Sequence, residues 1–573
     1  MKILNLSIYF FLIVVLFTSC TSKEETSNNK NNSSVKLYFG GDILTMEGDT
    51  PNYVEALATL NGKIVFIGKH ADALAQYTDC EKINLNGKTL LPGFIDGHAH
   101  FASFSSQAIG AKILPPPDAG AHNIDALINI LKEWNTPENR QLTGWIFGMG
   151  FDDSILEDKR FPTKHDLDKV STEYPIMIIH ISGHFAVVNS KGLEILKINA
   201  QTKNPEGGLI RREENNEPNG VLEELAAIPN YAKVLSPASK EAAEIFFDSG
   251  QEMAVSYGYT TAHEGRAMLQ NHQMLANAAE NGKLKIDAVS YIDYMFVDTL
   301  MKTKWYSNEY NNHYRIAGMK LTLDGSPQGR TAWRTQPYLI PPEGAEEGYK
   351  GYPAIPNDKD VQALYEKAFK NNWQIISHGN GDAAMDQMIR TMQAAQDKYG
   401  KSDRRNVLIH GQYIRYDQLD EFKKLDVITS LFPLHTFYWG DWHKQIIGDS
   451  LGNCISPTRT ALDKGLKISI HTDAPVALPN LMRMVGISVE RKSRSGQVIG
   501  EKEKLTPYEA LKGITIWSAY QHFEEDSKGT LKKDKLADLV ILDRNPLKVA
   551  ENEIKEIIVE ETIKEGITVY KKN

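Results

Sequence analysis

The sequence predicts an α/β protein in which a (β/α)8 barrel with large insertions adjoins a small β-sandwich built from both chain ends. First, its 573 residues exceed the size of one ordinary domain. Second, between about residues 92 and 520, apolar strand-like runs alternate with amphipathic helical stretches, which is typical of βαβ units. Third, both chain ends are rich in β-forming residues, whereas the middle is not.

The barrel strands are expected at short apolar runs, which occupy residues 175–180, 316–321, 373–378, 406–410, 427–431 and 466–471. Helices are expected at 359–369, 383–398 and 506–517. The region is longer than a typical barrel of about 250 residues. We therefore expect large insertions between the first and the middle strands.

The two chain ends are expected to combine. Near the N-terminus, β-rich runs lie at 36–39, 63–68 and 89–91, and Asn61-Gly62 is a strong hairpin signal. Near the C-terminus, similar runs lie at 538–543, 556–559 and 566–570. The sequence thus predicts a composite β-sandwich from residues 36–91 and 521–573, with the barrel at 92–520.

The first residues indicate a targeting segment. Residues 1–19 combine Lys2 with an apolar run at 8–17, and Thr18-Ser19 precede Cys20, as in a bacterial lipoprotein signal. That resemblance implies lipidation of Cys20, a disordered tether over 20–35, and a lipid-anchored protein of the bacterial cell envelope, in the periplasm or on the outer-membrane surface. A plain secretory signal or a short membrane anchor is the alternative.

Charge and composition exclude one class of partner. The net charge of −9 comes without a polybasic block, so nucleic acid is not an expected partner. A hydrophobic content of 41% is ordinary for a globular protein, and the sequence is compatible with a homo-oligomer.

His98 and His100 form the first chemical signal. In extended chain, residues two apart project to the same face, so both imidazoles can reach one point. Two converging imidazoles suit a divalent metal such as zinc. Taken alone, the pair is equally compatible with ordinary histidines.

Further polar residues follow other expected strands. Lys320 lies near the end of a middle strand, His378 and His410 end the next two, and Asp473 follows the last. Barrel active sites lie at the carboxyl ends of the strands, so these side chains are expected to converge with the histidine pair.

These motifs carry a resemblance. Residues 92–100, 377–382, 409–412 and 472–475 together resemble the amidohydrolase superfamily. Residues 150–154, 175–190, 206–208 and 318–326 resemble the third amidohydrolase family, its N-substituted formamide deformylase-like branch. Two departures are small: His471 stands where Ser is common, and Ile409 where an acidic residue is common.

The resemblance implies one or two divalent metal ions, zinc first among them. His98 and His100 would hold the more buried ion with Asp473, and His378 and His410 the more exposed one. Lys320 would bridge the ions after carboxylation, because an ammonium group has no lone pair. The alternative for Lys320 is an ordinary strand lysine that pairs with Asp324.

Catalytic and substrate-binding candidates follow from this chemistry. Asp473 would accept a proton from the attacking water and return it to the leaving nitrogen, and either His184 or the metal ion would stabilise the oxyanion. Weaker candidates for the substrate pocket are Trp145, His180, Asp324, Arg330 and His435.

The sequence therefore predicts a metal-dependent hydrolase that cleaves a non-peptide carbon–nitrogen bond of an amide, formamide or cyclic amide. The alternative is a surface lipoprotein that keeps the barrel and binds a small molecule without cleaving it. Intact candidate ligands favour the enzyme.

Overall fold

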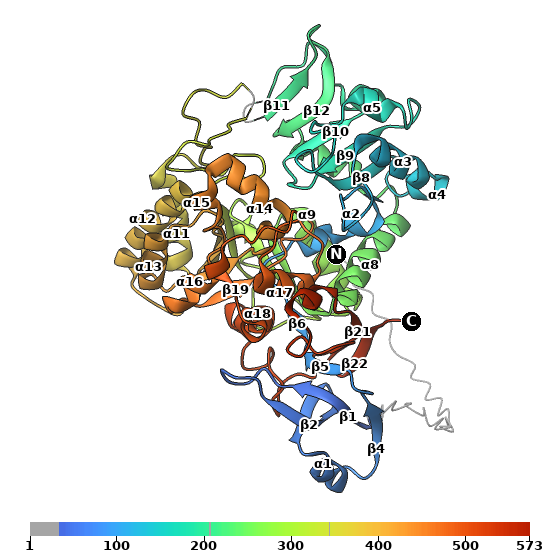
Figure 1. Cartoon of the computed structure of the whole chain (residues 1–573), viewed down its shortest axis with the longest axis vertical. Helices are drawn as coiled ribbons and strands as arrows, with labels where there is room; N and C mark the ends of the chain where they lie inside the picture. Colours follow the sequence, from blue (N-terminus) through green and yellow to red (C-terminus); the bar gives the residue numbers. More distant parts are fainter. Residues whose placement is uncertain (1–33, 206–207, 343) are drawn as a thin grey trace, which may run out of the picture.

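The computed structural model describes residues 34–573 except 206, 207 and 343. The expected signal peptide, Cys20 and almost all of the expected tether lie outside the described residues. The described chain forms three sheets, which Figure 1 shows stacked from the insertion (cyan and green, top) through the barrel to the sheet of the chain ends (blue and dark red, bottom).

The central sheet confirms the predicted barrel. Its neighbouring strands are parallel and follow the order β19-β18-β17-β16-β15-β14-β13-β6. Gly97 N donates to Ile470 O (3.4 Å), so the chain after the first strand also meets the last strand. The strands are β6 (Phe94–Ile95), β13 (Tyr259–Ala267), β14 (Asp287–Asp293), β15 (Tyr314–Thr322), β16 (Gln374–Gly379), β17 (Val407–His410), β18 (Ile428–Leu431) and β19 (Ile468–Ile470).

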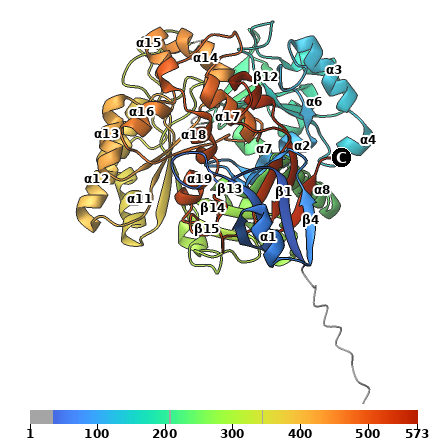
Figure 2. The same ribbon diagram turned by 60° about the horizontal axis from the view of Figure 1, so that its bottom comes forward.

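Helices surround these strands, as Figure 2 shows for α11, α12 and α13 on one side. The expected helix at 506–517 is two short helices in the structure, α18 and α19. The helices of this region are α8 (Lys240–Ser256), α9 (Leu269–Glu280), α10 (Val297–Leu300), α11 (Asp358–Lys370), α12 (Asp382–Tyr399), α13 (Tyr416–Lys424), α14 (Leu434–Ile447), α15 (Asp449–Gly452), α16 (Thr458–Asp463), α17 (Leu481–Glu490), α18 (Pro507–Gly513) and α19 (Ile516–Gln521).

The predicted insertion lies between β6 and β13 and has its own sheet, β11-β12-β10-β9-β8-β7. Its strands are β7 (Ala111–Lys112), β8 (Ile146–Phe151), β9 (Ile176–His180), β10 (Phe185–Val188), β11 (Gly208–Arg212) and β12 (Pro218–Glu224). Its helices, with those that border it, are α2 (Phe104–Ile109), α3 (Ile124–Trp134), α4 (Pro137–Arg140), α5 (Lys164–Asp168), α6 (Ser190–Leu196) and α7 (Ile228–Val234).

The insertion corrects one strand assignment. The run at 175–180 forms β9, which pairs with β8 and β10 rather than with any barrel strand. An apolar run indicates a buried strand but does not identify its partners. The barrel strands β13 and β14 were not predicted, because polar residues such as His263, Glu264 and Ser290 interrupt their apolar pattern.

Both chain ends contribute to one sheet, as predicted. Its order is β22-β21-β20-β5-β1-β2-β3, and β4 pairs with β1. Ile64 and Ile563, from strands far apart in this order, belong to one apolar cluster, so the sheet folds over itself like a sandwich. Its elements are β1 (Val35–Leu44), β2 (Tyr53–Leu60), β3 (Lys63–Gly68), α1 (His70–Gln76), β4 (Cys80–Asn84), β5 (Thr89–Pro92), β20 (Leu539–Leu542), β21 (Val559–Lys564) and β22 (Ile567–Lys571).

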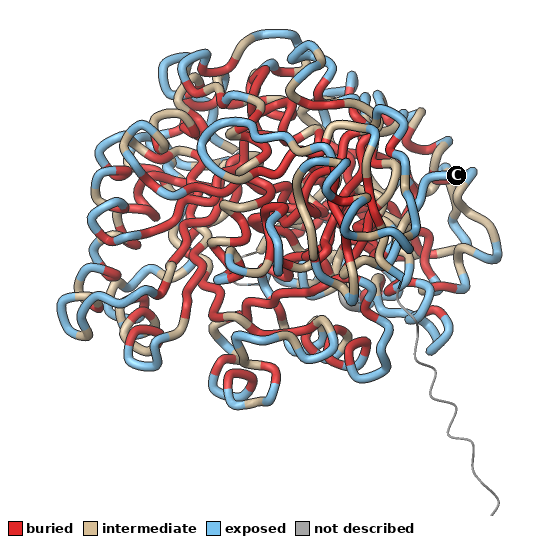
Figure 3. Tube along the Cα trace, turned by 90° about the horizontal axis from the view of Figure 1, so that it is seen from below, coloured by how far each residue is buried: buried red, intermediate tan, exposed pale blue. Residues whose placement is uncertain are grey.

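Buried residues concentrate in the interior of the molecule, as the red segments of Figure 3 show. The largest apolar cluster joins the outward faces of barrel strands to the helices around them. Within the described part of the chain, no helix combines the length and the hydropathy needed to cross a bilayer.

Candidate metal centre and active site

Two loops at the carboxyl end of the barrel carry the first candidate ligands. His98 and His100 follow β6, and Asp473 follows β19. The loops pair through their backbones: Asp473 N donates to His98 O (3.0 Å), and His100 N donates to Ala474 O (2.8 Å). The closed barrel thus brings the two motifs side by side.

Asp96 holds these loops together. One of its carboxylate oxygens accepts hydrogen bonds from the backbone N of His98 (3.1 Å) and of Thr472 (3.2 Å). The other oxygen accepts from Thr472 Oγ1 (2.6 Å) and Tyr259 OH (2.7 Å). Burial raises the pKa of Asp96 to about 6, although these hydrogen bonds lower it. Asp96 is therefore a positioning residue for both loops.

His98, His100 and Asp473 converge. Their ligand atoms lie within 4.8 Å of one another, and Asp473 Oδ1 lies 3.4 Å from His100 Nε2 and 3.7 Å from His98 Nε2. Atoms bound to one tetrahedral zinc ion lie roughly 3.4 Å apart. Asp473 Oδ1 is buried, and no described residue donates a hydrogen bond to it. An unsatisfied buried carboxylate oxygen beside two imidazoles fits a divalent cation.

The surroundings of His98 favour a metal ligand. Burial holds the pKa of His98 well below its usual value, so the ring is neutral and keeps a lone pair. Gly265 in β13 makes room for the ring, because a Cβ at that position would lie 2.0 Å from His98 Cε1. Any larger residue would displace His98.

Lys320 reaches the same place from β15. Its Nζ lies 3.3 Å from His98 Nε2, and its side chain is buried. Burial lowers the pKa of Lys320 to about 7, so a large fraction of the amine is uncharged near neutral pH.

His378 and His410 form the neighbouring pair, with ring centroids 4.7 Å apart. His471 Nε2 lies 3.0 Å from His410 Nδ1, and its own Nδ1 lies 2.9 Å from Ser430 Oγ. His471 thus orients the His410 ring, and Nε2 of His410 is the nitrogen that remains free. His378 Nε2 lies 3.1 Å from Gly325 O, which leaves Nδ1 as its free nitrogen.

The six candidate ligands line a cavity of about 150 Å³: His98, His100, Lys320, His378, His410 and Asp473. The insertion contributes Ser182 and His184, so the site lies between the barrel and the insertion. His184 Nδ1 lies 2.8 Å from Glu224 Oε2. Burial alone would lower the pKa of His184, but the carboxylate of Glu224 raises it above its usual value. Arg266 also lines the cavity and pairs with Asp293 (2.8 Å).

The family model that describes the amidohydrolase family matches residues 81–570. The chain belongs to the amidohydrolase family. The predicted enzyme class, a hydrolase acting on carbon–nitrogen bonds other than peptide bonds, is confirmed at the level of this family.

Relatives of this amidohydrolase extend over nearly its whole length. It is 26% identical to the candidate amidohydrolase YtcJ of Bacillus subtilis, over 94% of this chain and 99% of the relative. It is 25% identical to the N-substituted formamide deformylase of Arthrobacter pascens, over 90% and 95%. A solved structure of an uncharacterised metal-dependent hydrolase from Pyrococcus horikoshii has a TM-score of 0.71, with 23% identity over 90% and 99%. The predicted deformylase-like branch is thereby confirmed.

Most of the predicted site residues of the amidohydrolase meet at the cavity: the six candidate ligands His98, His100, Lys320, His378, His410 and Asp473, together with His184, Asp324 and His435. The carboxylate of Asp324 has a structural role, because it accepts hydrogen bonds from the backbone N of Trp333 (2.9 Å), Asn380 (2.9 Å) and Gly381 (2.7 Å). It therefore shapes the cavity wall.

Three weaker candidates lie away from the cavity: its lining does not include Trp145, Arg330 or His180. Trp145 packs in the core of the insertion, because it precedes a strand of that sheet. Arg330 lies over the Trp442 ring (4.7 Å) and donates to Pro341 O (3.1 Å).

His180 is turned toward Asp153 instead of the cavity. Ser182 N donates to His180 Nδ1 (3.2 Å), so Nδ1 acts as an acceptor and the ring proton lies on Nε2, which is 3.2 Å from Asp153 Oδ1. His180, Asp152 and Asp153 are close enough to hold a metal ion, but a protonated Nε2 has no lone pair to offer.

Four residues that contact predicted site residues or line the cavity were not themselves predicted as site residues from the sequence: Glu224, Arg266, Asp96 and His471. Glu224 and Arg266 lie in irregular or unpredicted strands, and Asp96 was seen only as part of a motif. His471 was noted as a departure from the family pattern, which was a usable signal, because it replaces a short side chain with one that reaches His410.

Proposed function

We propose that this amidohydrolase uses a divalent ion, with zinc as the first candidate, to hydrolyse the carbon–nitrogen bond of a small amide, formamide or cyclic amide. His98, His100 and Asp473 would hold the ion. The observation that supports the proposal is the convergence of two imidazole nitrogens on Asp473 Oδ1, which is buried and without a hydrogen-bond donor among the described residues. The name of the Arthrobacter relative supports an amide-type substrate.

A bound divalent ion would supply Lewis-acid polarisation of the substrate carbonyl and would make a water acidic enough to lose a proton near neutral pH. The chain supplies the proton transfers. Asp473 lines the cavity, and with Oδ1 on the ion the other oxygen of its carboxylate would accept the proton of the attacking water and return it to the leaving nitrogen. This transfer completes the cleavage of the bond between carbonyl carbon and nitrogen.

His184 stabilises the negative charge that develops on the carbonyl oxygen. Its pairing with Glu224 raises its pKa, so the ring carries a proton at a higher pH than a free histidine would. A protonated imidazole in a largely buried cavity is a strong hydrogen-bond donor to an oxyanion.

Lys320 becomes a ligand in this proposal after carboxylation. Its uncharged amine attacks CO₂, a nitrogen–carbon bond forms, and one proton leaves, which gives an anionic carbamate with two oxygens. Support comes from its place beside His98 and from burial, which keeps much of the amine uncharged. With His378 and His410, that carbamate would hold a second ion.

The test combines metal analysis with a substrate panel of N-acyl, N-formyl and cyclic amides. We expect one to two equivalents of bound metal in the purified protein, and hydrolysis of at least one compound that a chelator abolishes. His100→Gln should lose both, whereas His122→Gln, at an exposed histidine, should lose neither. Less than about one equivalent of metal without hydrolysis would favour a small-molecule binding protein.

Replacing Lys320 with Ala should abolish hydrolysis, because the bridging oxygens are lost. Short carboxylic acids such as acetate or propionate should restore part of the activity by occupying the vacated space. Lys304→Ala, at an exposed lysine paired with Glu280, is the matched control. Activity that survives in the Lys320→Ala enzyme without added acid would remove Lys320 from the metal centre.

For the location of the enzyme, we propose a lipid anchor on Cys20 in a bacterial envelope. The short apolar run at 8–17 and the Thr18-Ser19-Cys20 sequence support it. Radiolabelled palmitate should label the wild-type protein in a bacterial host but not the Cys20→Ala variant. Equal labelling of the two would contradict the anchor.

A further inference from the structure

A chain of three buried or half-buried rings leads from the cavity to a second pocket. His435 lines the cavity, and its Nδ1 lies 2.9 Å from His443 Nε2. His443 Nδ1 lies 2.8 Å from the hydroxyl oxygen of Tyr413. Tyr413 borders a separate pocket of about 300 Å³. Both histidines belong to α14, and Tyr413 lies between β17 and α13.

The positions of the protons in this chain follow from Tyr413. Burial raises the pKa of the Tyr413 phenol, so the hydroxyl keeps its proton. Among the described residues, His443 Nδ1 is the only hydrogen-bond partner of that hydroxyl, so Tyr413 donates and His443 Nδ1 accepts.

Both histidines are neutral, because burial lowers the pKa of His443 to about 3 and that of His435 well below its usual value. A neutral imidazole carries one proton, so a lone pair on His443 Nδ1 places its proton on Nε2. His443 Nε2 then donates to His435 Nδ1, and the proton of His435 lies on Nε2. That nitrogen has no hydrogen-bond partner among the described residues and is the one left for the cavity.

We propose that Tyr413 and His443 act as positioning residues that fix His435 as an N–H donor to an acceptor oxygen of the substrate. The proposal rests on the hydrolytic function proposed above and adds a second donor beside His184. The group recognised is a carbonyl oxygen, or the oxyanion that it becomes. Without the Tyr413 hydroxyl, nothing fixes the direction of the hydrogen bonds from His443 to His435. His435 Nε2 can then present a lone pair instead of a proton, and a lone pair repels that oxygen.

The ring of His435 is held rigidly for this task. Phe432 contacts it edge-on with centroids 4.7 Å apart, and Trp439 packs against it at 4.6 Å. Trp439 Nε1 donates to Asp152 Oδ2 (2.9 Å), which joins α14 to the end of β8 in the insertion. A donor held before the substrate arrives needs no reorganisation during the reaction.

The contrast with His184 supports separate tasks for the two donors. Glu224 favours the protonated form of His184, whereas His435 has a neutral histidine as its partner. The cavity thus offers one donor that carries charge and one that does not. The neutral donor, His435, recognises an acceptor oxygen by its position rather than by its charge, because the ring accepts no proton at ordinary pH and offers a single N–H direction.

The first experiment removes each member of the chain in the metal-loaded enzyme. His435→Leu should lower kcat by roughly 10²–10³-fold, the effect of deleting one oxyanion donor. His435→Gln should keep most of the activity, since its amide N–H can replace the ring Nε2. Tyr413→Phe should lower kcat by about tenfold, and Tyr416→Phe should leave it unchanged. Tyr416 lines the same pocket as Tyr413, but its hydroxyl donates to Glu503 (2.9 Å), so it is a matched control.

The decisive comparison places Tyr413→Phe in the His435→Gln background. A glutamine amide carries its N–H whatever Tyr413 does, so Tyr413→Phe should have no further effect on kcat there. An equal loss in both backgrounds would show that Tyr413 acts through general packing and would overturn the proposal.

A spectroscopic readout separates this proposal from the function itself. With ¹⁵N-labelled histidine in the metal-loaded protein, the signal absent from His435→Gln should show a protonated Nε2 and an unprotonated Nδ1, and Tyr413→Phe should reduce that difference. An unprotonated Nε2 in the wild type would overturn the inference. Absence of hydrolysis on every amide, with the expected tautomer, would overturn the proposed function instead.

Discussion

At the scale of single residues, burial acts on this site in two directions. It keeps His98 neutral, which preserves a lone pair for a metal ion, and it keeps much of Lys320 uncharged, which a reaction with CO₂ requires. It also makes the unsatisfied Asp473 Oδ1 unfavourable unless a cation accompanies it. The same exclusion of water thus keeps His98 able to bind a metal ion, keeps the Lys320 amine able to react with CO₂, and makes the Asp473 carboxylate require a cation.

Asp473 gives the sharpest prediction at this scale. Asp473→Asn keeps an oxygen near the metal ion but removes the proton acceptor, so kcat should fall by about 10²–10⁴-fold while metal content stays nearly constant. Stopped assays with metal analysis on the same samples measure both quantities. The exposed Asp449, as Asp449→Asn, is the control. Wild-type turnover in Asp473→Asn would exclude its role as the proton carrier.

At the scale of elements, the site depends on three neighbouring strands. β19, β6 and β13 lie side by side because the barrel closes. Asp473 and the histidine pair lie in the loops after β19 and β6, and Gly265 lies within β13. The backbone of a parallel barrel brings strand ends close together, but a metal ion needs its ligands at closely defined positions. Asp96 provides this by its hydrogen bonds to both loops, and Gly265 by leaving room for the His98 ring.

Gly265→Ala tests this adjustment. The added methyl group would overlap the ring of His98, so the ring must move and the bound metal should fall well below one equivalent, while circular dichroism stays that of the wild type. Gly120→Ala is the matched control, since no atom lies within 4 Å of the added carbon. Full metal content in Gly265→Ala would show that His98 is not held as described.

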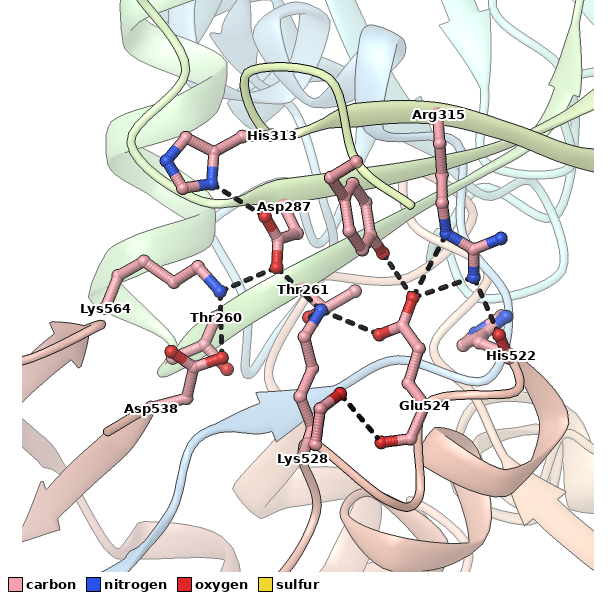
Figure 4. A network of polar contacts seen from close by, with 12 residues as sticks. Thr260, Thr261, Asp287, His313, Arg315, His522, Glu524, Lys528, Asp538 and Lys564 are labelled. Carbon is pink, nitrogen blue, oxygen red and sulfur yellow. Dashed lines mark hydrogen bonds and ion pairs between the residues drawn. The ribbon is translucent and has the colours of Figure 1, made fainter. Parts of the chain in front are cut away.

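At the scale of the whole molecule, a buried network of charges joins the sheet of the chain ends to the amino-terminal end of the barrel (Figure 4). Asp287 Oδ2 at the start of β14 lies 2.6 Å from Lys528 Nζ and 2.6 Å from Lys564 Nζ of β21. Glu524 pairs with Lys528 (2.7 Å) and with Arg315 (2.7 Å). Removing one partner of such a network is strongly destabilising, because it leaves a buried charge without its counter-charge.

Glu524 makes the free energy of unfolding depend on pH in the acid range. Burial alone would raise its pKa, but Lys528 and Arg315 lower it from 4.5 to about 2. Because the folded pKa is the lower one, the stabilisation is present above pH 4.5 and is lost as pH falls toward 2, by about 3 kcal/mol. Urea unfolding at several pH values should show this loss in the wild type and a smaller one in Glu524→Gln.

The control for this prediction is Glu280→Gln, at an exposed pair with Lys304, which should keep the pH dependence of the wild type. A Glu524→Gln protein whose stability falls as steeply as that of the wild type between pH 4.5 and 2 would contradict the assignment to Glu524.

Much of the site was predictable because ligand types and barrel strands are both local signals. The strand-end positions of His378 and His410 followed from single apolar runs that end in histidine. The failures share one cause, since β9 looks like a barrel strand locally, whereas β13 and β14 carry polar residues into the barrel interior. Choice of partner strand is a long-range property that no window of sequence contains.

The amino-acid sequence by itself determined the barrel, the shared sheet of the chain ends and the six candidate ligands, because strand periodicity and ligand chemistry reside in short segments. Only the tertiary structure decided that Asp473 Oδ1 is unsatisfied, that Glu224 supports His184, and that His443 and Tyr413 stand behind His435. Those relations depend on distances between residues far apart in the chain, and such distances exist only once the barrel has closed against its insertion.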